Sequence, residues 1–170
     1  MLGVNLVFAG FALTLNGVSY FTKVDDNVKA FCNILVGIVI AINAIFQTAT
    51  AVDHVTFGFA AAMWLFSLNY FVIAAHIFFK AESWKAFGLY GLFAAIVSFH
   101  FMLDTILTLG DGAPWEMVYL WGMWFLLWLQ TFLSIMVCAR IDKLSPYILI
   151  INGTASTFVP GLLILSGIIL

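Results

Sequence analysis

Charged side chains are scarce in this sequence, and their scarcity excludes a water-soluble domain. Six Lys or Arg residues and eight Asp or Glu residues make up 8% of the 170 residues, whereas a soluble domain carries about 25%. Hydrophobic residues make up 65%. A chain of this composition has too few polar side chains to cover a surface in water, so it is predicted to be a membrane protein.

Ionisable residues are almost missing from the interiors of the long apolar runs. Only Asp104, with His100 one helical turn before it, lies within such a run, near one end. A proton-coupled carrier requires a carboxylate near mid-depth, and a retinal protein requires a lysine inside a helix. The sequence therefore argues against both functions. His76 and His100 would differ in depth by roughly 16 Å, too much for one haem iron to bind both. The sequence predicts no haem, metal or other cofactor, and it lacks nucleic-acid and phosphate-loop motifs.

The few Lys and Arg residues lie in every second gap between the apolar runs. The gaps between apolar runs around 48–55 and 109–114 hold no Lys or Arg. Positive charge near the ends of membrane spans marks the cytoplasmic side. The pattern therefore predicts six spans, with loops one, three and five in the cytoplasm and both termini outside. The residues that carry it are Lys23 and Lys29, Lys80 and Lys85, and Arg140 and Lys143.

The apolar runs are long enough for six transmembrane helices, because a bilayer core of ~30 Å needs roughly 20 apolar residues per helix. The fold class is therefore an all-α membrane protein, with residues 1–170 forming a single six-helix domain of three helical hairpins. The opening MLGVNLVFAG has no charged segment before its apolar run, so it is interpreted as a first helix rather than a cleaved signal. Pro160 is expected to kink the last helix. We place the helices near 3–21, 30–49, 56–79, 86–106, 114–138 and 146–169.

The polar residues inside the spans are mostly neutral hydrogen-bonding groups. One interpretation is hydrogen bonding between helices, which stabilises membrane bundles by roughly 1 kcal/mol per contact. As a set, these residues also suit a pore for a neutral polar solute, which needs hydrogen bonds in place of water but no charged partner. The set comprises Asn5, Asn16, Asn33, Asn43, Asn69, Gln130, Asn152, Thr154, Ser156 and Thr157.

A stripe of tryptophans follows one face of the fifth predicted helix. Trp121, Trp124 and Trp128 are spaced i, i+3 and i+7, so their indoles share one face. Trp115 and Tyr119 fit an interfacial belt, but Trp124 and Trp128 lie too deep for one. Packing between helices would explain the stripe. The more specific interpretation is a narrow slot of flat indole faces, whose N–H groups donate hydrogen bonds to a planar solute.

Several segments resemble one known family, the urea and short-chain amide channels that bacteria encode with ureases and amidases (the AmiS/UreI family). The opening MLGVNLVFAGFALTLNGVSYFTKVD and the later SPYILIINGTASTFVPGLL are the more specific parts. NYFVIAAH, SWKAFGLYGLF and the tryptophan stripe extend the likeness over nearly the whole chain.

The resemblance implies a six-helix protomer in a hexameric ring, with one pore per protomer and lipid filling the centre of the ring. It also implies passive passage of urea or simple amides, a bacterial inner-membrane location and a cytoplasmic urease or amidase as functional partner. No chemistry on the solute is implied, so the protein is not expected to be an enzyme. The lining residues carried over by the resemblance are Leu2, Leu6, Leu13, Asn16, the aromatic pair Tyr70 and Phe71, Trp121, Trp124 and Trp128.

Two features depart from the acid-gated members that the chain resembles. Asn152 stands where those members have a Glu in the sixth helix, and the second loop is short, with His54 as its histidine. Asn152 is predicted to hydrogen-bond the passing solute, because an amide offers both a donor and an acceptor. The candidate pH-sensing residues are His54, His100 and Asp104.

Two other functions stay open at this point. One is a proton-linked carrier of a small solute that uses His100 and Asp104. The other is a non-transporting subunit of a membrane complex, with the tryptophan stripe buried against a partner. Proteoliposome flux separates these alternatives from a channel, because a channel gives non-saturating flux that depends on the solute gradient alone.

Overall fold

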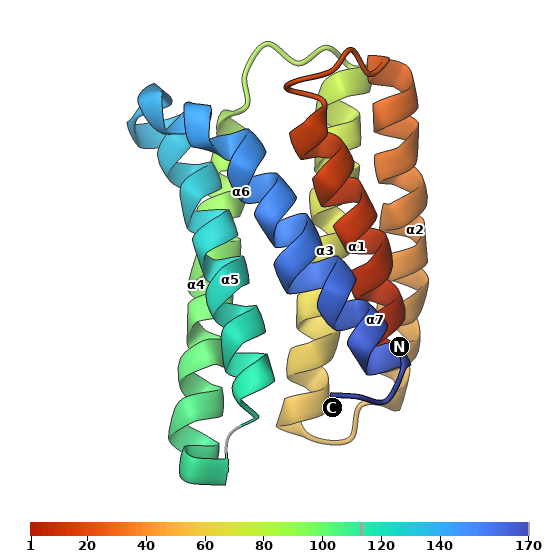
Figure 1. The fold of residues 1–170 in the computed structure, drawn as a ribbon, viewed down its shortest axis with the longest axis vertical. Helices are drawn as coiled ribbons and strands as arrows, with labels where there is room; N and C mark the ends of the chain where they lie inside the picture. Colours follow the sequence, from red (N-terminus) through yellow and green to blue (C-terminus); the bar gives the residue numbers. More distant parts are fainter. Residues whose placement is uncertain (113, 170) are drawn as a thin grey trace.

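The computed structural model describes residues 1–112 and 114–169, apart from the side chains at positions 54, 55, 109 and 111, and folds them into a helical bundle (Figure 1). The first five spans are α1 (Leu2–Val18), α2 (Asp26–Thr50), α3 (His54–Phe78), α4 (Lys85–Leu109) and α5 (Trp115–Phe132), which π-helical turns extend over Leu133–Val137. The sixth span consists of α6 (Ser145–Ile151), π-helical turns (Asn152–Phe158) and α7 (Val159–Leu165). Short 3₁₀ segments cover Gly110–Gly112 and Ala139–Leu144.

Side-chain caps set the start of two helices. The Asp25 carboxylate accepts hydrogen bonds from the backbone N–H groups of Asn27 and Val28, at 2.9 and 3.1 Å. These bonds satisfy donors that a helix start leaves free, so α2 begins at Asp26 rather than near residue 30. At the start of α3, Asp53 accepts from the Thr56 N–H at 2.8 Å within a reciprocal capping box.

The lengths of the helices agree with a multi-pass membrane protein. Five helical segments of the described chain are long and apolar enough to cross a bilayer, and α1 has 17 residues. At 1.5 Å per residue α1 is about 26 Å long, which is close to the thickness of a hydrocarbon core. The all-α fold class and the prediction of six spans are therefore confirmed.

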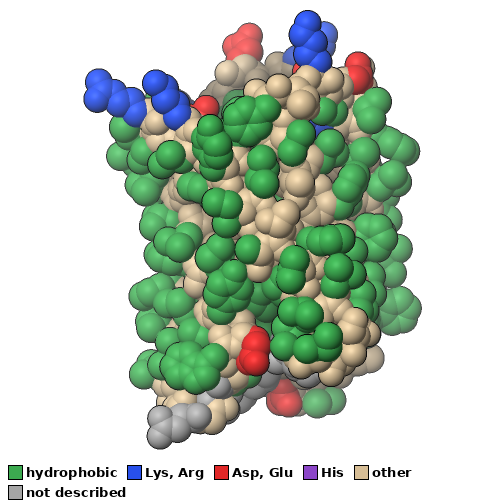
Figure 2. Space-filling model, viewed as in Figure 1, with side chains coloured by type: hydrophobic (Ala, Val, Ile, Leu, Met, Phe, Trp, Pro, Cys, Tyr) green, Lys and Arg blue, Asp and Glu red, His purple; other side chains and the backbone are tan. Residues whose placement is uncertain are grey.

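The two ends of the bundle differ in charge. The Lys and Arg side chains in view lie at one end, and apolar side chains cover the flank below them (Figure 2). Both termini lie at the opposite end (Figure 1). We call these the basic end and the termini end. The predicted orientation, with the basic end in the cytoplasm, stays a prediction.

The closest packing joins two pairs of consecutive spans and one pair from the two ends of the chain. α2 packs along α3, α4 packs along α5, and α1 packs along the sixth span. The loop between α2 and α3, at residues 51–53, joins them at the termini end. The basic loops join other, more loosely packed pairs of consecutive spans, so the arrangement brings the first and last spans of the chain together.

Glycines allow α1 and the sixth span to touch backbone to backbone. A Cβ atom on Gly10 would lie 2.6 Å from the carbonyl oxygen of Gly153, and one on Gly153 would lie 2.8 Å from the backbone nitrogen of Thr14. Close approach through small residues is the usual way in which membrane helices gain packing energy. This contact holds the N-terminal helix against the sixth span.

The expected disturbance around Pro160 takes the form of π-helical turns at Asn152–Phe158. Proline offers no N–H to the preceding turn. Side-chain hydroxyls bind carbonyl oxygens in this stretch: the Ser156 hydroxyl donates to the Asn152 carbonyl at 2.9 Å, and the Thr157 hydroxyl donates to the Gly153 carbonyl. The Tyr119 hydroxyl of α5 donates to the Ala155 carbonyl at 3.1 Å, which ties α5 to the same turns.

We predict that Gly10→Ala destabilises the protein, because the added methyl group would overlap the backbone of the sixth span. Overpacking of this kind costs about 1–3 kcal/mol. Gly122→Ala in α5 is the matched control, since its Cβ would meet only the Met102 sulfur at 3.4 Å. Thermal unfolding in detergent should show a lower melting temperature for Gly10→Ala and an unchanged or higher one for Gly122→Ala. Equal melting temperatures for wild type and Gly10→Ala would contradict the close contact.

Candidate functional site

Two cavities lie inside the bundle at different heights. The larger has a volume of about 610 Å³, lies toward the basic end and is called the basic-end cavity. The smaller has a volume of about 20 Å³, lies toward the termini end and is called the termini-end cavity. Leu13, Asn16 and Trp128 line the first, whereas Leu2, Leu6, Trp121 and Trp124 line the second.

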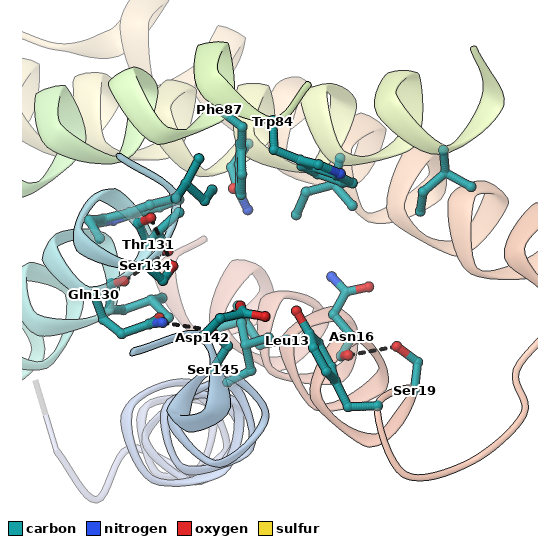
Figure 3. Close-up of a pocket in the computed structure, with 18 of the residues that line it drawn as sticks. Leu13, Asn16, Ser19, Trp84, Phe87, Gln130, Thr131, Ser134, Asp142 and Ser145 are labelled. Carbon is teal, nitrogen blue, oxygen red and sulfur yellow. Dashed lines mark hydrogen bonds between the residues drawn. The ribbon is translucent and has the colours of Figure 1, made fainter. Parts of the chain in front are cut away.

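Polar side chains from several spans line the basic-end cavity (Figure 3). The Gln130 amide donates to the Ser145 hydroxyl at 2.6 Å, and that hydroxyl donates to the Asp142 carboxylate at 2.9 Å. Trp84 and Phe87, at the start of α4, form the facing wall. The charged lining residues are balanced in sign: Lys29, Lys85, Glu82 and Asp142.

The termini-end cavity is narrow and almost wholly apolar. Phe59, Met63 and Phe66 of α3 face Trp121 and Trp124 of α5 across it. Its volume is close to that of a single water-sized probe. Among the described residues that line it, Asn5 carries the one side-chain amide.

A contact among three aromatic rings separates the two cavities. Phe66 meets Trp124 edge-on, with ring centroids 4.9 Å apart, and it also meets Trp128 at 5.8 Å. Trp121 meets Trp124 in a second edge-on contact at 5.0 Å. The three tryptophans are all buried, so the predicted stripe does face the interior. A solute that crosses the bundle by way of both cavities would have to pass this ring contact.

Three buried polar atoms next to the cavities have no hydrogen-bond partner among the described residues: Trp124 Nε1, Asn5 Nδ2 and Asn69 Oδ1. The first two are donors beside the termini-end cavity, and the third is an acceptor beside the basic-end cavity. A buried polar group without a partner costs about 1–3 kcal/mol. Nearly all such groups in native proteins are paired, so a polar solute gains the most from hydrogen bonding at these atoms.

Two of the predicted lining residues contact other helices instead of a cavity. Tyr70 is 0% exposed, and its hydroxyl donates to the Ala9 carbonyl of α1 at 3.1 Å. Phe71 lies against Gly37 of α2, where a Cβ atom would be 3.1 Å from the Phe71 ring. Neither residue is among those that line the two cavities. Of the pair, it is Tyr70 that points into the bundle.

The side-chain amide of Asn16 bonds to another helix, whereas that of Asn152 bonds within its own span. Asn16 exchanges two hydrogen bonds with Asn33 of α2, both at 2.9 Å, and also lines the basic-end cavity. Asn152 donates to the Ile148 carbonyl at 3.2 Å and accepts from the Ser156 hydroxyl at 2.9 Å. Its side-chain bonds therefore lie within its own span. The prediction that it binds a solute has no support from these contacts.

Of the candidate pH-sensing residues, His100 and Asp104 line neither cavity. The side chain of His54 lies outside the described residues. His100 is exposed on α4 with its ring beside Phe101, and Asp104 accepts a hydrogen bond from the Thr108 hydroxyl at 3.2 Å. A different histidine lies near the mouth of the basic-end cavity: His76 stacks on Trp84 with centroids 4.3 Å apart, and its Nε2 is 3.2 Å from the Ser83 carbonyl.

Many residues beside the cavities were not in the predicted lining, and Asn5, Phe66 and Asn69 are the ones that bear most on the route. Asn5 and Asn69 carried a usable signal, because each is an amide inside an apolar span, as Asn16 is. Phe66 carried none, because it is one of 18 phenylalanines in the chain. Its ring contacts with Trp124 and Trp128 could be seen only in the structure.

The fold and the internal cavities define a helical membrane protein with an aromatic-lined interior, whose narrow termini-end cavity has no charged side chain among the described lining residues, as suits a transporter of neutral solutes. The sequence model of one protein family, described as AmiS/UreI family transporter, matches residues 1–168, and the chain belongs to this family. The family resemblance stated from the sequence is therefore confirmed.

Relatives and solved structures are similar over the whole chain. The acid-activated urea channels of two Helicobacter pylori strains, J99 / ATCC 700824 and ATCC 700392 / 26695, are each 30% identical over 192 residues, covering 96% of this chain and 97% of the relative. The crystal structure of the H. pylori urea channel and a cryo-electron microscopy structure of that channel in its closed state both match. Each has a TM-score of 0.83 and 26% identity, with 100% of both chains covered.

We predict that Asn16 and Asn33 stabilise the protein as a pair. Asn33→Leu leaves the buried Asn16 amide without its partner, which should cost about 1–3 kcal/mol. The double variant Asn16→Leu/Asn33→Leu strands neither amide, so its loss should be smaller than the sum of the two single losses. Thermal unfolding of the three variants measures this coupling. Strictly additive losses would show that the two amides act independently.

Proposed function

We propose that the protein is a passive channel for urea or small neutral amides. The observation that carries this proposal is the pair of cavities meeting at the Phe66, Trp124 and Trp128 rings, with the unpartnered Trp124 N–H beside the narrow part. Family membership and the urea channels among the relatives support the same function. The termini-end cavity and the ring contact define the narrowest part of the route.

Hydrogen bonds offset the dehydration of the solute along this route. A planar amide that leaves water loses the hydrogen bonds of its carbonyl and N–H groups. The Trp124 N–H and the Asn5 amide present donors for a carbonyl oxygen. An ion gains no comparable compensation, because no charged side chain lines the termini-end cavity within the described residues. Desolvating a charge without a partner is far more costly than desolvating an amide, so the termini-end cavity excludes ions.

The shape of the aromatic contact sets the size limit. Trp124 is 2% exposed and is wedged between Phe66 and Trp121. Flat rings at these separations leave room for a thin solute only after small side-chain movements, and a planar molecule requires the smallest movement. The tryptophans therefore select by thickness, while the donors select by hydrogen bonding.

The proposal also covers the location, the functional partner and the assembly of the channel. With the basic end in the cytoplasm, the basic-end cavity forms the cytoplasmic vestibule of a protein in the bacterial inner membrane. A cytoplasmic urease or amidase would consume the solute that enters there. A homo-hexamer with lipid at its centre is the proposed assembly, and the apolar flank of the bundle is suited to contact both lipid and neighbouring protomers (Figure 2). The proton-linked carrier has no comparable support, because His100 and Asp104 line neither cavity.

We predict that Trp128→Ala relaxes the size limit. Removing this indole opens the ring contact, so N-methylurea should gain permeability relative to urea by about tenfold, the lower end of what one methyl group is worth in a close-fitting apolar pocket. Trp115→Ala is the matched control on the same helix, because Trp115 is 62% exposed. Stopped-flow light scattering on proteoliposomes gives both permeabilities. A wild-type ratio in Trp128→Ala, at normal incorporation, would leave Trp128 a packing role only.

We also predict that urea flux varies by less than about threefold between pH 5 and pH 7.5. A histidine titrates in this range, but His100 and Asp104 lie away from the cavities, and a weakly coupled site shifts a conducting population only slightly. Initial flux rates across the range in one vesicle preparation test this expectation. A rise of tenfold or more on acidification would contradict it, and His→Gln variants at positions 54 and 100 would then identify the sensor.

A further inference from the structure

Asn69 is a buried polar residue of α3. It is 2% exposed, and its Oδ1 has no hydrogen-bond partner within the described part of the chain. It lines the basic-end cavity together with Ile73 and Ile77, which follow it at i+4 and i+8. These three residues form the face that α3 presents to the cavity, so the Asn69 side chain is a single polar group in an otherwise apolar strip of that helix.

The position of Asn69 along the route follows from its neighbours. Phe66, three residues earlier, touches both Trp124 and Trp128 at the ring contact. Three residues of helix rise by about 4.5 Å, which is about the length of a small amide. A solute that has passed the rings therefore meets Asn69 within one of its own lengths, while its other end is still near Trp124.

The unpartnered atoms on the two sides of the ring contact have opposite hydrogen-bonding character. The termini-end side presents the donors Trp124 Nε1 and Asn5 Nδ2, and the basic-end side presents the acceptor Asn69 Oδ1. A carbonyl oxygen fits the first side, and an N–H group fits the second. Urea and primary amides carry both groups on one planar frame.

We propose that Asn69 is a specificity-determining residue, whose side-chain oxygen accepts a hydrogen bond from a solute N–H as the solute leaves the ring contact. The inference rests on the proposed channel function and deepens it. It assigns to Asn69 the recognition of the solute N–H, beside the carbonyl recognition by the Trp124 and Asn5 donors. The burial of an otherwise unpaired acceptor is then compensated whenever such a solute passes.

Two substitutions of the same shape separate hydrogen bonding from packing. Asn69→Val and Asn69→Thr differ only in that a hydroxyl replaces one methyl group, so the threonine keeps a hydrogen-bonding oxygen at this position. Urea and acetamide permeabilities are measured by stopped-flow light scattering on vesicles that contain equal amounts of purified, folded protein. Asn69→Val should lower both permeabilities by about three- to tenfold, as expected for the loss of one hydrogen bond. Asn69→Thr should recover at least half of the wild-type value.

The other outcomes overturn the proposal in distinguishable ways. Equal losses in Asn69→Val and Asn69→Thr would show that side-chain shape matters and hydrogen bonding does not. Wild-type permeability in Asn69→Val would exclude any contribution of Asn69 to passage, although the channel function would stand. Wild-type protein that passes neither solute faster than protein-free vesicles would overturn the channel function, and the role of Asn69 with it.

Discussion

The structure depends on one constraint: a bilayer offers no hydrogen bonds to a buried polar group. Each amide or hydroxyl inside a span therefore needs a partner within the protein. Asn16 pairs with Asn33, and Asn43 donates to Asn5 at 2.6 Å, so two amide contacts tie α1 to α2 at different depths. Ser156 and Thr157 bind carbonyls of their own span. Against this background, the unpartnered atoms of Asn5, Asn69 and Trp124 stand out, and all three lie beside the cavities.

The same constraint links the architecture to selection of the solute. Glycines bring α1 against the sixth span, which places Leu6 and Leu13 of α1 opposite the aromatic residues of α3 and α5. The rings then supply a barrier with almost no polar groups. Because the barrier holds few donors and acceptors, each one discriminates strongly between solutes that match it and solutes that do not.

Much of the fold was predictable because lipid imposes simple rules. The apolar runs set the number of spans, and the spacing of Trp121, Trp124 and Trp128 put them on one buried face. The helix boundaries were less predictable where a cap decides them, as Asp25 does for α2. The pairing of spans was not predictable from the basic loops, because it depends on local fits such as Gly10 against Gly153. The cavity lining was predictable in part. Asn69 could not be predicted as a lining residue without knowing the direction of its side chain. Asn152 was predicted to line the pore from the family pattern, although its amide bonds stay within its own span.

We propose that solute crosses this protein passively, down its own gradient. The most direct test is the concentration dependence of urea flux into proteoliposomes that contain the purified wild-type protein, measured with and without an imposed proton gradient. We expect flux that rises linearly with the urea gradient and does not respond to the proton gradient. Flux that saturates and collapses when the proton gradient is dissipated would contradict it, and would identify a carrier instead.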